Sequence, residues 1–69
     1  MNEKISYAEV IIKGNDINYK DISLCDLRNY VPWYRNKKNG IYQVHSNKFS
    51  QIYYNLDDAI NKFLELKGK

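Results

Sequence analysis

The middle of this sequence holds the side chains that could contact phosphate groups and stack on nucleic-acid bases. Between Asp26 and Asp57 there is no acidic residue, and this segment contains seven of the chain's ten aromatic residues. Five basic residues give it a charge of +5, whereas the whole chain carries +3. The basic residues are Arg28, Arg35, Lys37, Lys38 and Lys48, and the rings available for stacking are Trp33, Tyr34 and Tyr53. Cations interleaved with rings are typical of a surface for an anionic partner, so we predict that this segment binds nucleic acid.

Three further side chains of this segment could contact base edges. Gln43, His45 and Gln51 offer hydrogen-bond donors and acceptors of the kind that bases recognise. A purely structural explanation also exists, because loop lysines are commonly solvated, tyrosines could complete a small core and His45 could be an ordinary half-exposed strand residue. The structural explanation suits individual lysines, whereas the long gap in acidic residues is harder to explain in this way, so both explanations stay open for the segment as a whole.

Residues that could carry out catalysis are few. Cys25 and His45 are the only thiol and the only imidazole of the sequence, and no feature of the sequence places them together or supplies an orienting acid. Asp57 and Asp58 would lie on different sides of a first helical turn, where they interact favourably with the helix dipole. No spacing of histidines and cysteines matches a zinc site, and no glycine-rich loop could hold a phosphate. We therefore predict a protein that is not an enzyme and that uses no metal ion or cofactor.

Length and composition predict a single small domain, residues 1–69. A hydrophobic content of 43% and a charged content of 28% are typical of a folded soluble protein. A chain of this length buries only about 60% of its unfolded surface, so its core is thin. The single cysteine favours a reducing compartment, which predicts a cytoplasmic location. The residues after Met1 form neither a signal-peptide core nor a span long enough for a bilayer, so no membrane association is expected.

The first half of the chain predicts a hairpin followed by a short helix. Ile5–Lys13 is rich in β-branched residues and predicts a strand, and after a Gly-Asn-Asp turn Ile17–Ile22 predicts the returning strand. Ser23 and Asp26 have the spacing of a capping box, which predicts a helix of about two turns that ends before Pro32.

The following segment predicts a three-stranded meander. Trp33–Arg35 predicts a strand, and Asn39-Gly40 is the strongest signal for a tight hairpin turn, because both residues accept a positive φ. Ile41–Ser46 and Phe49–Tyr54 predict the next two strands. Alternation along these strands places Tyr42, Val44, Ile52 and Tyr54 in the core and Gln43, His45, Gln51 and Tyr53 on the exposed face.

The end of the chain predicts an amphipathic helix. Asn55 is a helix cap, Gly68 ends the helix, and Asp58 and Lys62 have the spacing of a favourable ion pair. The apolar stripe consists of Leu56, Ala59, Ile60, Phe63 and Leu66. The predicted fold class is therefore α+β, with a small antiparallel sheet, built from an N-terminal hairpin and a β-meander, and a C-terminal helix packed on one face.

One resemblance to a known family covers about half of the chain. The motifs that carry it run from the basic and aromatic strand at Trp33 through Arg35-Asn36-Lys37-Lys38-Asn39-Gly40 and Ile41-Tyr42-Gln43-Val44 to Tyr54-Asn55-Leu56-Asp57-Asp58-Ala59-Ile60, and they end at Leu66. This order resembles the DNA-binding domains of plant ethylene-response factors and of phage integrase amino-terminal arms, in which a helix backs a three-stranded sheet whose other face enters the major groove. The resemblance implies that Arg35, Lys37, Lys38, Gln43 and Gln51 lie near DNA and that Leu56, Ala59, Ile60 and Phe63 are packing positions.

A protein partner is the alternative prediction. Ten aromatic residues exceed what so thin a core can bury, and exposed Tyr, Trp and Arg side chains are enriched at interface hot spots. A small protein without catalytic groups could be a phage-type inhibitor of a host enzyme or of a defence nuclease such as a CRISPR effector. A third possibility is a homodimer formed through an edge strand, either Phe49–Tyr54 or Ile17–Ile22.

Overall fold

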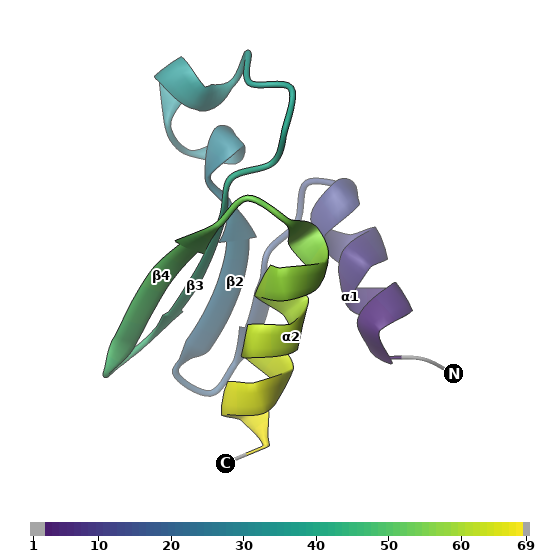
Figure 1. Ribbon diagram of the computed structural model, residues 1–69, viewed down its shortest axis with the longest axis vertical. Helices are drawn as coiled ribbons and strands as arrows, with labels where there is room; N and C mark the ends of the chain where they lie inside the picture. The colour runs from purple at the N-terminus through teal and green to yellow at the C-terminus, as the bar shows by residue number, and fades with distance from the viewer. Residues whose placement is uncertain (1–2, 69) are drawn as a thin grey trace.

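The computed structural model describes residues 3–68, which form an antiparallel sheet covered on one face by two helices (Figure 1). The strand order is β1-β2-β3-β4, so every strand pairs with its neighbour in the sequence. The helices are α1 (Glu3–Ile12) and α2 (Leu56–Lys67), and the strands are β1 (Ile17–Tyr19), β2 (Ile22–Asp26), β3 (Tyr42–Ser46) and β4 (Phe49–Tyr53). The fold class is α+β and the C-terminal helix packs on the sheet, as predicted.

Helix α2 forms where its local signals place it. The Asn55 side chain accepts a hydrogen bond from the main-chain N–H of Asp58 at 3.2 Å, and Gly68 caps the other end. Ala59, Ile60 and Phe63 are buried, which confirms the predicted packing stripe. Lys62 was predicted to pair with Asp58, but its ammonium group instead lies 2.5 Å from the Glu65 carboxylate.

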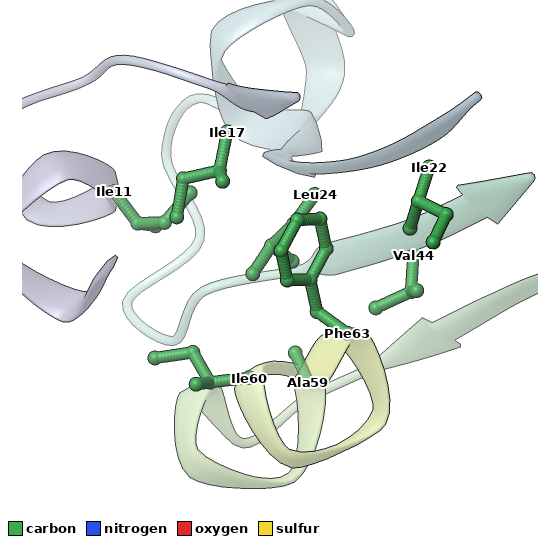
Figure 2. Close-up of a cluster of buried hydrophobic side chains, with 8 residues drawn as sticks. All are labelled: Ile11, Ile17, Ile22, Leu24, Val44, Ala59, Ile60 and Phe63. Atoms are coloured by element: carbon green, nitrogen blue, oxygen red, sulfur yellow. The ribbon is translucent and has the colours of Figure 1, made fainter. Parts of the chain in front are cut away.

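The core lies between α2 and the central strands (Figure 2). Phe63 is fully buried, and its ring meets that of Tyr7 edge-to-face with 5.4 Å between centroids. Leu24 and Val44 are directly opposite each other on β2 and β3, and both are fully buried. The cluster is completed by Ile11 from α1, Ile17 from β1, Ile22 from β2, and Ala59 and Ile60 from α2.

The predicted strand Ile5–Lys13 is a helix, α1. Its inward residues, Tyr7, Ala8 and Ile11, follow the helical period, and β-branched residues are tolerated because the helix packs against α2. The turn at Gly14 ends this helix instead of joining two strands. Gly14 has φ of +93° and donates to the carbonyl of Ile11 at 3.0 Å, while Asn15 donates to the carbonyl of Val10 at 3.1 Å. These two bonds form a Schellman motif.

The first hairpin is β1–β2 and not residues 5–22. It turns at Lys20-Asp21, because Tyr19 pairs with Ile22. Lys20 adopts φ of 55°, the positive value that tight hairpin turns require and that costs about 1–2 kcal/mol for a residue with a Cβ.

We expect Lys20→Gly to stabilise the protein by about 0.5–1 kcal/mol, because the relief of this strain exceeds the entropic cost of glycine. Urea denaturation of the two proteins would measure the difference. Asp21→Gly is the control, since Asp21 has no positive φ and is expected to lose stability when replaced. A loss of stability in Lys20→Gly would contradict the prediction.

Three further local predictions are wrong. Ser23 lies in β2 instead of starting a helix, and the Asp26 cap begins only a short 3₁₀ helix, Leu27–Asn29. The predicted strand Trp33–Arg35 is a second 3₁₀ helix, Pro32–Tyr34, for which proline is a suitable first residue. At Asn39-Gly40 neither residue has a positive φ, so there is no type I′ turn, and a Cβ on Gly40 would collide with the Tyr42 ring.

The register of β3 against β4 differs from the prediction by one residue. The turn contains only Asn47 and Lys48, so Ser46 pairs with Phe49. A shift of one residue exchanges the faces of a strand. Gln51 and Tyr53 therefore lie on the face that the helices cover, and Ile52 lies on the open face with Gln43 and His45.

Candidate functional site

Residues 27–41 form a lobe that leaves the sheet between β2 and β3 (Figure 1, top). It contains the two 3₁₀ helices and an irregular return segment. The main-chain N–H of Leu27 donates to the carbonyl of Ile41 at 2.7 Å and closes the base of the lobe. The lobe contains no acidic residue, and it presents Trp33, Arg35, Lys37 and Lys38 as exposed side chains.

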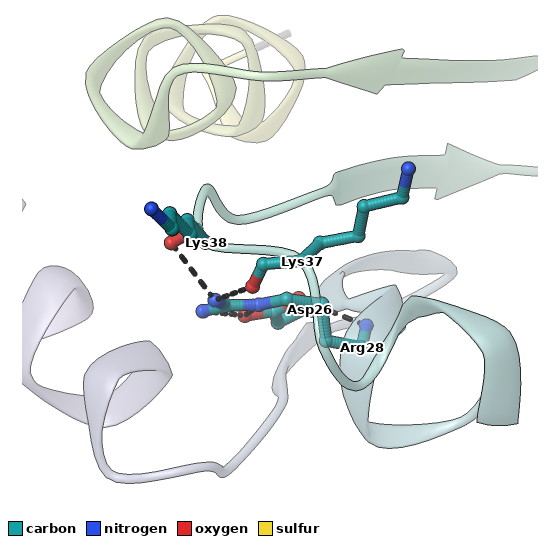
Figure 3. Close-up of polar contacts among 4 residues, drawn as sticks. All are labelled: Asp26, Arg28, Lys37 and Lys38. Carbon is teal, nitrogen blue, oxygen red and sulfur yellow. Dashed lines mark hydrogen bonds and ion pairs between the residues drawn. The ribbon is translucent and has the colours of Figure 1, made fainter.

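Arg28 anchors the lobe to the sheet (Figure 3). Its Nη2 donates to Asp26 Oδ2 at 2.8 Å and its Nε to the same oxygen at 3.0 Å. Its Nη1 donates to the main-chain carbonyls of Lys37 at 3.2 Å and Lys38 at 3.4 Å. The guanidinium therefore joins β2 to the return segment of the lobe, which is a structural role for a residue predicted to contact phosphate.

The carboxylate of Asp26 is charged despite its burial. Burial acts to raise the pKa of Asp26, but hydrogen bonds from the Arg28 side chain and main chain outweigh it, so that the pKa is lowered. The same contact raises the pKa of Arg28. The two groups thus form an ion pair at neutral pH.

A second contact ties the lobe to the start of β1. The Tyr30 hydroxyl donates to Asp16 Oδ2, and this hydrogen bond raises the pKa of Tyr30. The other carboxylate oxygen of Asp16, Oδ1, is buried without a hydrogen-bond partner. Tyr30 therefore uses its hydroxyl for support of the lobe, while its ring stays exposed.

A hollow of about 290 Å³ opens beside the lobe. Its lining includes two tyrosines, Tyr34 and Tyr54, and two lysines, Lys37 and Lys38. The remaining lining residues are Asn39 and Ile41. Trp33 is 76% exposed next to this site, and its ring contacts that of Tyr34 at 6.2 Å between centroids. The site thus combines flat apolar surfaces with positive charge.

The predicted site residues separate into groups. Trp33, Tyr34, Arg35, Lys37 and Lys38 lie together on the lobe. Gln43 and His45 lie on the open face of the sheet, whereas Gln51 and Tyr53 lie on the helix-covered face. Lys48 lies in the β3–β4 turn, at the end of the sheet away from the lobe. The basic residues therefore do not share one face.

The sequence prediction missed Tyr54, which it assigned to the core. Tyr54 follows the last residue of β4 and precedes the Asn55 cap, so it belongs to neither element and is 73% exposed. The two-residue length of the β3–β4 turn is the signal that would have set the correct register.

The open face of the sheet carries no lysine, arginine, aspartate or glutamate. The residues on this face are Asn18, Ser23, Cys25, Gln43, His45, Ser50 and Ile52. Cys25 and His45 occupy diagonal positions there. Burial, and then the charges of Asp16 and Asp26, raise the pKa of the Cys25 thiol, so this thiol is protonated and weakly nucleophilic at neutral pH.

A larger hollow of about 410 Å³ lies between the two helices. Its lining includes Lys4 and Asp57, whose side chains form an ion pair at 2.7 Å, so this hollow lacks the unbalanced charge of the lobe. Across residues 3–68 no group of three or more His, Cys, Asp or Glu side chains is placed to hold a metal ion.

The described part of the chain contains two α-helices, α1 and α2. Neither is long and apolar enough to cross a membrane. Compared with protein-family models, curated proteins and solved structures, the chain matches none.

Proposed function

We propose that this chain is a non-enzymatic nucleic-acid-binding protein that holds a single strand against the lobe. The observation that carries the proposal is the hollow lined by Tyr34, Lys37 and Lys38 of the lobe and by Tyr54, beside a lobe that contains no acid. Single-strand binding proteins combine a cationic groove for the backbone with rings on which bases stack. The lobe supplies both.

A single strand suits this surface better than a duplex does. The open sheet face, which would correspond to the major-groove face in the family that the sequence resembles, carries no lysine or arginine. Cations and exposed rings are instead concentrated on the lobe. Unpaired bases present the flat surfaces that Trp33 and Tyr54 can stack on, whereas the bases of a duplex do not.

The charge reversal Lys37→Glu together with Lys38→Glu should weaken binding of a fluorescently labelled, mixed-sequence single-stranded oligonucleotide. The weakening follows from the removal of lysine–phosphate interactions, and the slope of log K against log salt should flatten by about 0.7 for each phosphate that is no longer neutralised. Fluorescence anisotropy over a series of salt concentrations measures both quantities.

The matched control is Lys20→Glu together with Lys48→Glu, which changes the net charge equally at exposed positions in the two turns at the end of the sheet away from the lobe. If the control weakens binding as much as the lobe variant does, net charge and not the lobe is responsible. Trp33→Ala and Tyr54→Ala should each lower affinity by about 5- to 150-fold, the range for loss of one stacked base.

A protein partner is the second candidate function. Trp33 and Tyr54 are large exposed rings and Arg35 lies on the same lobe, and such residues dominate protein interfaces. A small inhibitor of an enzyme or nuclease would use the same surface. Negligible oligonucleotide binding at physiological salt would favour this candidate over nucleic acid.

A further inference from the structure

The outer edge of β4 is open along the described chain. β4 is the last strand of the sheet, and no element lies beside its outer edge (Figure 1). Charged residues and prolines are among the features with which proteins protect a sheet edge. Residues 49–54 contain neither. This edge is therefore able to accept another strand.

The register identifies the main-chain groups that face outward. A two-residue turn closes on a pair that exchanges both N–H···O bonds, so Phe49 and, by alternation, Gln51 and Tyr53 bond to β3. The N–H and C=O groups of Ser50 and Ile52 consequently point away from the sheet. Ile52 is 39% exposed on the open face.

The opposite edge of the sheet is protected. β1 has only three residues, and the charged turn Lys20-Asp21 follows it directly. Short edge strands and nearby charge are common defences against strand addition. Strand addition is thus directed to β4.

We propose that two copies of this chain pair through β4, antiparallel about a two-fold axis at Gln51. Ser50 of each copy then lies opposite Ile52 of the other, and the outward groups of these residues form four main-chain hydrogen bonds. Gln51 faces its own counterpart as a non-hydrogen-bonded pair. The inference does not rest on the proposed function, because it is argued from the β4 edge alone. The two share one residue, Tyr54, which lines the hollow beside the lobe and follows the last residue of β4.

The charge pattern of β4 fits a second copy as the occupant. Identical charged chains normally repel, but the paired segment is neutral, and Lys48 falls opposite Tyr54 of the other copy instead of another cation. Five residues of strand bury much less than the roughly 800 Å² per partner of a standard interface. The dimer is accordingly weak and forms in a concentration-dependent way.

Disulfide trapping tests the two-fold axis directly. In a Cys25→Ser background, Gln51→Cys should form a covalent dimer rapidly under mild oxidation, because residues of a non-hydrogen-bonded pair have Cα atoms about 4.5 Å apart, which a disulfide can span. Asn18→Cys on β1 is the control and should cross-link only at the collision rate. Equal rates for the two variants would overturn the proposal.

Sedimentation equilibrium on the unmodified protein gives a second test. The apparent mass should rise towards that of a dimer with concentration, and Ile52→Lys should keep the protein monomeric while Ile52→Thr, which retains strand propensity, preserves the dimer. Ile52 is outside the core, so circular dichroism should show that the variants remain folded. A protein that stays monomeric at every concentration, or an Ile52→Lys variant that still dimerises, rules the pairing out.

Discussion

Replacing Arg28 with alanine is expected to destabilise the protein by about 3 kcal/mol. Asp26 is only 4% exposed, and in the variant its carboxylate would be buried without its partner. The carbonyls of Lys37 and Lys38 would also lose their donor. Denaturation in urea at neutral pH measures the loss, which is large for a small domain whose total stability is on the order of 5 kcal/mol.

Arg35→Ala is the matched control for this prediction. Arg35 is the same residue type on the same lobe, but it is exposed. Its replacement should change stability by no more than about 0.5 kcal/mol. Equal losses in the two variants would show that the Asp26–Arg28 contact does not hold the lobe.

The pH dependence of stability provides an independent readout of the same contact. The folded-state pKa of Asp26 lies below its ordinary value of 3.8, so its stabilising contribution is complete above that value and is lost as the pH falls through the lowered pKa. Arg28→Ala should remove this contribution, because burial without the guanidinium raises the pKa of the carboxyl group. Urea denaturation of both proteins between neutral and acidic pH tests the direction.

Phe63→Ala is expected to cost about 3–5 kcal/mol, the largest effect of any single substitution proposed for this chain. Phe63 is fully buried and packs with Leu24 and Val44 beneath α2, where its ring also meets Tyr7. Within residues 3–68 the buried apolar side chains around Phe63 form one cluster, and no second core compensates there for the cavity. Circular dichroism during thermal denaturation should show a melting temperature lowered by about 12–40 °C, because each kcal/mol of lost stability shifts the midpoint of so small a protein by about 4–8 °C.

Two substitutions make the Phe63 prediction testable even if the alanine variant does not fold. Phe63→Leu retains much of the volume and should cost less, so that its loss can be measured by urea denaturation. Asn61→Ala lies on the exposed side of the same helix and should leave stability nearly unchanged. A fully cooperative, stable Phe63→Ala protein would contradict the central place of this ring in the core.

Helix α2 could be predicted from the sequence because its signals are local and agree with one another. The Asn55 cap, the apolar stripe through Ile60 and Phe63, and Gly68 all lie within one short segment. The strands β3 and β4 could be located for the same reason. The sequence also showed that the segment forming the lobe contains basic and aromatic residues but no acidic residue.

Helix α1 could not be predicted, because its local signals suit two structures. Gly14-Asn15 serves equally well as a hairpin turn or as the end of a helix, and the apolar residues before it are compatible with either. The choice depended on the burial of Ile11 in a core shared with Ile60 and Phe63, which come from the other end of the chain. Such contacts leave no trace within a short window of sequence.

Which residues lie together in the candidate site could be determined only from the tertiary structure. The order of residues alone established that a cationic, aromatic segment lies between Asp26 and Asp57. In the folded chain Arg28 forms an ion pair with Asp26, and Lys48 lies at the end of the sheet away from the lobe. Tyr54 instead lines the hollow together with Tyr34. The strand register and the contacts that hold the lobe depend on interactions between different segments of the chain. The free energies of those interactions cannot be inferred from a short window of sequence.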